Sequence, residues 1–168
     1  ALNGPLPEAP AVAVVAVKPQ TMAAALRALA PLGGGRTLVL SIAAGTSLAA
    51  FEAALGQGTP VVRAMPNLPS RIGRGVTAYV AAPACSAHDK DLVEQLLEPL
   101  GAVEPIAAER LMDVVTAVAG SGPAYVFLLA EVLAVAAEQE GLDRDTAMRL
   151  ASRTVAGAGA LMLETGDT

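Results

Sequence analysis

The feature that most constrains this chain is an unbroken run of apolar, mostly β-branched residues at Val12–Val17. A strand with one face in water alternates apolar and polar residues, so a continuous run indicates a strand covered on both faces of a parallel sheet. Runs of the same type follow at Thr37–Ile42 and Val61–Met65. The sequence therefore predicts a buried parallel sheet in this part of the chain.

Helical patterns separate these runs. Residues 21–32 place Met22, Leu26 and Leu29 at helical spacing, and Ser47–Leu55 does the same with its own apolar residues. Strand, helix, strand, helix and strand in succession are typical of βαβ units. We expect an α/β fold that corresponds to the second half of a Rossmann-type doubly wound sheet.

A fourth strand is predicted at Val76–Ala82 and a closing strand at Ala102–Ala107. The helix between them can be capped by Ser86, with Asp89 three residues later as the second member of a capping box. The predicted inner face of that helix consists of leucines, namely Leu92, Leu96 and Leu97.

After Ala108 the apolar period is helical throughout. One stripe is predicted from Leu111, Val114, Val115 and Val118. A second helix, beginning at Pro123 and ending at Gly141, is apolar nearly all round and needs an outside partner to cover it. Asp143 can cap a third helix, in which glycines indicate close helix packing. We expect a partial dinucleotide-binding domain at residues 1–108 and a partial, all-α dimerisation domain at residues 109–168.

Composition excludes several classes of function. The chain has a net charge of −5 and 2% aromatic residues, which argues against nucleic-acid binding. Its longest uncharged apolar stretch, Val114–Ala130, is too short for a membrane span and contains Gly120–Pro123, so we expect it to be buried in protein. A single cysteine and a single histidine predict no metal site and favour the reducing cytoplasm.

Ligands of open α/β sheets bind beyond the carboxyl ends of the strands, and three predicted strands end in unusual residues. The first ends in Val17-Lys18-Pro19-Gln20, the second in Ser41-Ile42-Ala43-Ala44-Gly45, and the third in Arg63-Ala64-Met65-Pro66-Asn67-Leu68-Pro69. A lysine suits a nucleotide phosphate, small residues let a flat ring approach the backbone, and an asparagine amide suits a carboxamide. Ordinary turn chemistry explains each segment almost as well.

Other signals are weaker. Neither Gly33-Gly34-Gly35 nor Gly73-x-Gly75 has the strand, glycine and helix order of a phosphate loop. Gly120-Ser121-Gly122-Pro123 predicts a sharp break in the helical region, either functional or a tight corner. No hydrolase constellation is present in the sequence, whereas hydride transfer needs little from the protein beyond positioning, because the cofactor supplies the chemistry.

Together with the segment from Asp113 to Tyr125, these three strand ends resemble pyrroline-5-carboxylate reductase in order and spacing, and the resemblance covers essentially the whole chain. It implies reduction of 1-pyrroline-5-carboxylate to L-proline by NADPH or NADH, the last step of proline biosynthesis. It also implies a cytoplasmic homodimer that is often assembled into a ring of dimers.

The resemblance assigns roles by position. The cofactor-binding residues it implies are Asn3, Ala16, Val17, Lys18, Pro19, Ile42, Ala43, Ala44 and Asn67. It associates Glu109 with the substrate and assigns no catalytic residue. Two positions depart from the family pattern, because Ala11 replaces an acidic residue and Leu68 a threonine.

Two alternatives stay open at this point. One is another two-domain reductase, of the β-hydroxyacid dehydrogenase or imine reductase type. The other is a non-catalytic oligomerisation fragment, because the family's phosphate loop and substrate-carboxylate loop are expected before Ala1 and after Thr168. The chain by itself is then expected to bind NADPH weakly and to be inactive.

Overall fold

The computed structural model describes residues 10–166. Its centre is a five-stranded sheet with the order β1-β2-β3-β4-β5. The strands are β1 (Val12–Val15), β2 (Leu38–Ser41), β3 (Val61–Met65), β4 (Gly75–Ala81) and β5 (Gly101–Pro105). All five predicted strands are present among the described residues, and their ends differ from the predicted ends by at most two residues.

The sheet is mixed rather than wholly parallel. Strands β1, β2 and β3 are parallel, β4 is antiparallel to β3, and β5 is parallel to β4. The reversal follows from a short connection, in which the 3₁₀ turn Leu68–Ile72 takes the place of a crossover helix. Because Met65 pairs with Ala78, the start of β4 extends past the carboxyl end of β3.

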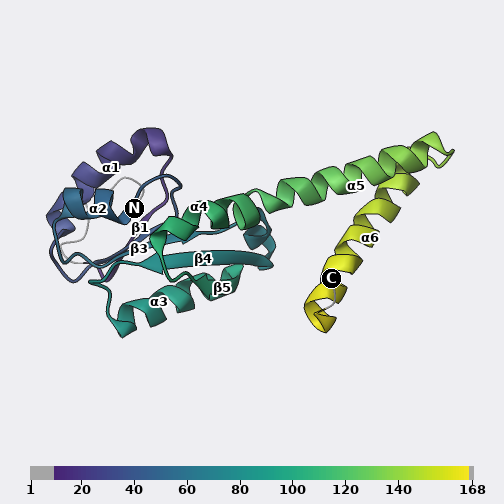
Figure 1. Cartoon of the computed structure of the whole chain (residues 1–168). Helices are drawn as coiled ribbons and strands as arrows, with labels where there is room; N and C mark the ends of the chain where they lie inside the picture. Colours follow the sequence, from purple (N-terminus) through teal and green to yellow (C-terminus); the bar gives the residue numbers. More distant parts are fainter. Residues whose placement is uncertain (1–9, 167–168) are drawn as a thin grey trace. The chain divides into compact units, whose positions relative to one another are not determined.

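Helices cover both faces of the sheet, as expected for a doubly wound fold (Figure 1). On one face, α1 (Met22–Leu29) and α2 (Leu48–Leu55) pack over Val39 and Val61, with Phe51 fully buried. On the other face, α3 (Ala87–Leu97) packs over Leu40 and Val62. Alternate residues of β2 and β3 therefore face opposite sides of the sheet, and each side has its own hydrophobic core.

Two details of the predicted burial are wrong. Val14 is 59% exposed, because β1 is an edge strand in the described sheet. Leu96 is 45% exposed, whereas Val93 is fully buried beside Leu97. The inner face of α3 is therefore rotated from the predicted leucine stripe.

The predicted capping box of α3 is confirmed, and a further cap is found at α2. Ser86 and Asp89 form a reciprocal capping box, in which the Ser86 hydroxyl accepts from Asp89 N and the Asp89 carboxylate accepts from Ser86 N. Ser47 caps α2 by accepting from Ala50 N at 3.1 Å. Each cap satisfies a backbone donor that the first helical turn leaves without an intrahelical partner.

After β5 the chain forms a 3₁₀ turn (Glu109–Leu111), then α4 (Met112–Val115), then a π-helical turn (Thr116–Gly120). The predicted stripe is wrong in detail, since Met112 is buried whereas Val114 and Val118 are exposed. The predicted sharp break at Gly120–Pro123 is also wrong. Ser121 keeps right-handed helical dihedrals, and the residues just before it, Thr116–Gly120, form a π-helical turn.

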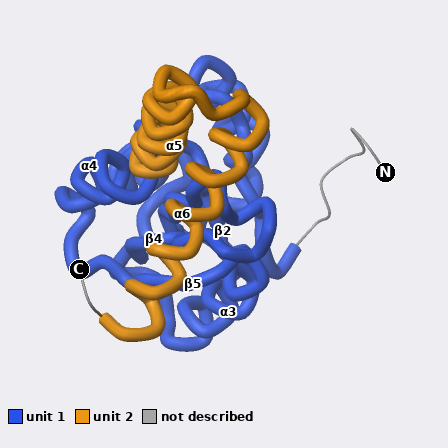
Figure 2. Tube along the Cα trace, turned by 90° about the vertical axis from the view of Figure 1, so that its right-hand side faces the viewer, with its two compact units in different colours: residues 1–120 blue, residues 121–168 orange. Residues whose placement is uncertain are grey.

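The chain divides into two compact units, residues 1–120 and 121–168, coloured separately in Figure 2. The second unit is a helical pair, α5 (Gly122–Gln139) and α6 (Arg144–Thr165), with Asp143 as the predicted cap of α6. The buried contact between these helices is made of alanines, namely Ala134, Ala147 and Ala151, with Ala137 packed beside them. A Cβ at Gly157 or Gly159 would meet nothing within 4 Å, so the close packing expected of these glycines is not found within the described chain.

Helix α5 exposes apolar side chains all round, including Phe127 and Leu129, which are 58% and 52% exposed. By length and composition alone, the helical stretch Glu109–Gln139 could cross a membrane. An 18-residue segment within it has a mean hydropathy of 1.7, and 6% of that segment is buried. The expected burial of Val114–Ala130 is therefore not met within a single chain. A surface of this kind needs a cover, either protein or lipid.

Candidate cofactor and substrate site

The three predicted strand ends meet at one edge of the sheet. Val15 pairs with Ser41, and Ser41 pairs with Arg63, so these residues form one row across β1, β2 and β3. The strands are parallel, so the residues that follow the row leave the sheet in the same direction. The topology thereby collects at a single edge the segments in which the sequence predicts a ligand.

The segment after β1 forms a tight turn. Lys18 O accepts from both Thr21 N and Thr21 Oγ1, at 2.9 and 3.0 Å, and Pro19 begins the 3₁₀ turn. Lys18 and Ala16 are exposed and Val17 is half-buried. The cation is therefore accessible at the sheet edge. Asn3, the remaining cofactor-binding candidate, lies outside the described residues.

The segment after β2 stays close to β1. Ile42 N donates to Val15 O at 3.1 Å, and Ala43 N donates to the buried Ser41 hydroxyl at 3.3 Å. Ala43 is 9% exposed and Ala44 is exposed. Gly45 has φ +78, a conformation that few residues besides glycine adopt. The result is a smooth surface of backbone and methyl groups beside Lys18.

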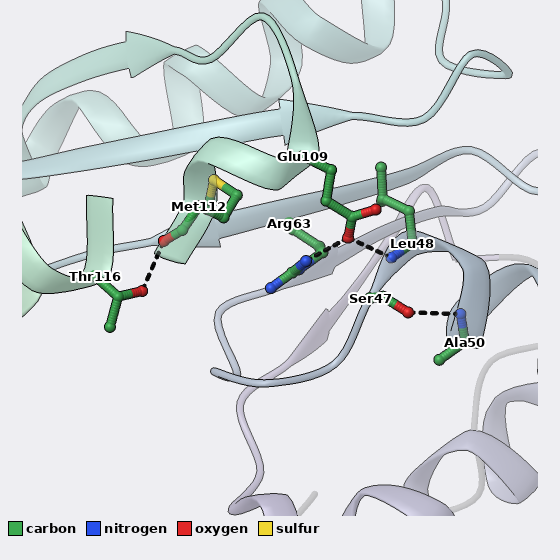
Figure 3. Close-up of polar contacts among 7 residues, drawn as sticks. All are labelled: Ser47, Leu48, Ala50, Arg63, Glu109, Met112 and Thr116. Atoms are coloured by element: carbon green, nitrogen blue, oxygen red, sulfur yellow. Dashed lines mark hydrogen bonds and ion pairs between the residues drawn. The ribbon is translucent and has the colours of Figure 1, made fainter. Parts of the chain in front are cut away.

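Glu109 joins three elements, as Figure 3 shows. Its Oε1 accepts from Leu48 N, at the first position of α2, at 2.7 Å, and forms an ion pair with Arg63 of β3. The helix dipole of α2 and the guanidinium both favour a carboxylate at this point. Glu109 therefore fixes the start of the helical region against β3 and the loop that follows β2.

Arg63 is the partner that the sequence analysis did not identify. Its side chain is 13% exposed, and Nε is buried without a hydrogen-bond partner among the described residues. A charged residue in the otherwise apolar run Val61–Met65 was the available signal, because a buried charge requires a counter-ion. The sequence did not reveal that the counter-ion lies 46 residues away.

The amide of Asn67 is bonded on both sides. Oδ1 accepts from Val76 N at 3.0 Å, and Nδ2 donates to Ala119 O at 3.2 Å. The first contact holds the start of β4, and the second holds the π-helical turn. Both contacts lie within the first unit, just past the carboxyl end of β3.

Shifted pKa values in the described part of the chain do not involve these residues. Burial, with the hydrogen bond to Glu94, raises the pKa of Tyr79 to about 12. Burial also raises the pKa of the Cys85 thiol. A groove of about 550 Å³ between α3 and β5 is lined by Asp91, Glu94 and Glu98. These acidic residues would repel phosphate, which leaves the sheet edge as the better cofactor site.

From β1 to β3, this edge of the sheet presents the Lys18 cation, then the apolar surface of Ile42–Ala44, and then the backbone held by Asn67. That series suits a cofactor with an anionic end and a flat uncharged ring, in which the protein mainly positions the groups. Among the described residues no cluster of three or more His, Cys, Asp or Glu could hold a metal ion.

Comparison with known proteins identifies the same family in both parts of the chain. The sequence model of the pyrroline-5-carboxylate reductase dimerisation family matches residues 109–168. A pyrroline-5-carboxylate reductase of Pseudomonas aeruginosa is 45% identical over 152 residues, which cover 90% of this chain and 56% of that protein. The chain thus spans about half the length of the curated relatives it matches.

Solved structures agree with the sequence matches. A pyrroline-5-carboxylate reductase from Coxiella burnetii superposes with a TM-score of 0.88 at 38% identity, covering 94% of this chain and 58% of that one. The Plasmodium falciparum enzyme, solved with NADP bound, gives a TM-score of 0.85 at 31% identity, covering 94% and 59%. Over at least 90% of its length the chain is therefore similar, in sequence and in fold, to part of a pyrroline-5-carboxylate reductase.

Proposed function

We propose that the protein reduces 1-pyrroline-5-carboxylate to L-proline with NADPH or NADH, the last step of proline biosynthesis. The observation that carries this proposal is the collection of the Lys18, Ile42–Ala44 and Asn67 segments at one sheet edge. Curated relatives named pyrroline-5-carboxylate reductase are 36–45% identical to the chain, which supports the proposal. A bound nicotinamide would supply hydride to the carbon of the protonated imine, and the C=N bond would become the C–N bond of proline.

The cofactor is proposed to lie along this edge. Lys18 and Pro19, with Ala16, Val17 and Asn3 before them, take the nucleotide end. The apolar surface at Ile42–Ala44 lines the middle, and the segment around Asn67 lies at the nicotinamide end. The order follows the strand order, because β1, β2 and β3 are neighbours. An NADP-bound relative of known structure supports the choice of cofactor.

Glu109 is proposed to face the substrate. Its Oε1 is already bonded to Leu48 N and Arg63, so a contact with a protonated imine nitrogen would use Oε2. A carboxylate at that place stabilises the iminium form, which accepts hydride readily. Residues 109 to 168 then have two tasks, since they carry this carboxylate and the dimerisation surface.

We further propose that residues 1–108 form part of the cofactor-binding domain, and that residues 109–168 form part of the dimerisation domain of a cytoplasmic homodimer, assembled further into a ring of dimers. The exposed apolar surface of α5 supports protein as its cover, because the family that matches this region is named for dimerisation. No nucleic acid or membrane is proposed as a partner.

The test is NADPH oxidation by the full-length protein with and without 1-pyrroline-5-carboxylate, together with detection of proline. We expect oxidation to require the imine and proline to accumulate in equal amount. Oxidation that is independent of the imine would refute the assignment.

The same assay separates the two rival functions. Reduction of NADP⁺ by 3-hydroxy acids, measured in the reverse direction, or oxidation of NADPH with a broad range of imines would favour another two-domain reductase. Binding of a second copy without NADPH oxidation under any condition would favour a non-catalytic oligomerisation protein.

A further inference from the structure

Asn67 occupies a position that its role as a cofactor ligand does not explain. Both polar atoms of its amide are used inside the protein, by Val76 N and by Ala119 O. These contacts use one of the two Nδ2 hydrogens and one of the two Oδ1 lone pairs, so backbone groups of the protein already fix the orientation of the amide. The two contacts define a clamp between β3, the start of β4 and the π-helical turn Thr116–Gly120.

The π-helical turn accepts this donor at one of its carbonyls. Its wider turn alters the intrahelical hydrogen-bond ladder, so a carbonyl such as that of Ala119 benefits from an outside partner. The donor is held firmly, because Asn67 lies between Pro66 and the 3₁₀ turn that contains Pro69.

Glycine is needed on one side of this clamp, at Gly75, and the packing is tight on the other, at Gly120. A Cβ at Gly75 would lie 2.9 Å from Asn67 Oδ1 and 2.7 Å from Ser70 N, which leaves no room for a larger residue. A Cβ at Gly120 would lie 3.2 Å from Cε of Met65, the last residue of β3. The π-helical turn is therefore packed directly against the carboxyl end of β3.

This edge is where the proposed cofactor presents its reacting ring. We propose that Asn67 is a positioning residue, which places the π-helical turn as a wall of the nicotinamide and substrate end of the site without touching the cofactor. The inference rests on the proposed reductase function. It assigns Asn67 an indirect role in hydride transfer in place of a direct contact.

The experiment compares Asn67→Asp with wild type in the full-length protein. Aspartate is almost isosteric and keeps the acceptor for Val76 N, but it replaces the donor to Ala119 O with an oxygen. The matched control is Gln57→Glu, the same amide-to-carboxylate change at an exposed position. Four quantities are measured: kcat, the primary deuterium isotope effect on kcat, the Kd of NADP⁺, and the Kd of 2′-phospho-ADP-ribose, the cofactor without nicotinamide.

We expect Asn67→Asp to lower kcat by at least about tenfold, because small displacements of a reacting pair have effects of this order. The isotope effect should rise as hydride transfer becomes rate-limiting, the Kd of 2′-phospho-ADP-ribose should stay unchanged, and Gln57→Glu should behave as wild type. A general loss of structure would not raise the isotope effect at constant Kd.

Three results overturn the inference. Unchanged kcat in Asn67→Asp would show that the clamp is not needed. A loss of NADP⁺ affinity as large as the loss of kcat, with 2′-phospho-ADP-ribose unaffected, would show direct contact with nicotinamide. Wild type that does not reduce the imine refutes the proposed function and this inference with it, whereas the first two results refute the inference alone.

If Asn67→Asp does not fold, Gly120→Leu provides the same test. A Cβ alone would lie 3.2 Å from Met65 Cε, and a side chain as large as leucine cannot be accommodated by a small shift of Met65, so the π-helical turn must move while Asn67 stays intact. We expect a several-fold lower kcat with unchanged affinity for 2′-phospho-ADP-ribose, and wild-type kcat would overturn the inference.

Discussion

Arg63 and Glu109 form an ion pair across 46 residues of sequence, between a sheet strand and the first turn of the helical region. The same Glu109 oxygen accepts from Leu48 N, so one carboxylate holds a strand, a helix N-terminus and the start of a second helical segment. Arg63 is largely buried, and it therefore depends on this carboxylate for compensation of its charge.

Removal of that carboxylate is expected to destabilise the protein. Glu109→Ala leaves both Arg63 and Leu48 N without their acceptor and should lower the free energy of unfolding by about 2 kcal/mol. Glu109→Gln keeps an oxygen for Leu48 N, so about half that loss is expected. Urea titration at constant m-value gives both numbers. A double-mutant cycle with Arg63→Met should show coupling of about 1 kcal/mol or more, and additive losses would contradict the ion pair.

The capping box of α3 provides an independent test of local stability. Ser86→Ala removes the acceptor for Asp89 N, and the free energy of unfolding should fall by about 1 kcal/mol. Ser86→Asn, another good N-cap residue, should recover most of the loss. Equal losses in the two variants would mean that the cap does not contribute.

Gly75 is expected to tolerate no side chain. Gly75→Ala should lower stability by about 1–3 kcal/mol, because the new methyl group overlaps backbone and side-chain atoms of Ser70. Adding Ser70→Ala removes the hydroxyl but not Ser70 N at 2.7 Å, so the double variant should remain destabilised. Recovery of wild-type thermal stability in the double variant would show that only the hydroxyl obstructs.

The Cys85 thiol is expected to react slowly. Burial raises its pKa, and the Sγ hydrogen donates to Val61 O at 3.3 Å. The folded protein holds this proton to a higher pH than the unfolded chain, so the associated stability is present below the unfolded pKa and declines as pH rises through the folded pKa. Alkylation at about pH 8 should be slower than in urea, where the thiol returns to its ordinary pKa. Equal rates would contradict the burial.

The apolar surface of α5 is expected to hold the subunits together. Leu129→Asp should shift the sedimenting species toward the monomer, because a carboxylate would have to be buried in the interface. Leu96→Asp is the control, since Leu96 is exposed to a similar extent on α3, outside the family's dimerisation region. Dissociation in the control alone would place the interface on α3.

The sequence allowed the strands, the caps at Ser86 and Asp143, and the meeting of three strand ends to be predicted. These depend on local periodicity and turn chemistry, which neighbouring residues determine. The antiparallel direction of β4 was not foreseen, because a run of apolar residues does not reveal the direction of its pairing. The contacts of Glu109 and Asn67 were also missed, since each joins residues far apart in the chain.

Because α5 is exposed, the stability of the second unit would depend on the concentration of the protein. An isolated helical pair held by alanines buries little apolar surface, so in the proposed dimer most of its folding free energy would come from association. For a folded dimer in equilibrium with unfolded chains, each tenfold dilution removes about 1.4 kcal/mol of apparent stability per mole of dimer. The abundance of the protein in the cell, as well as its sequence, would then set the folded fraction of this unit.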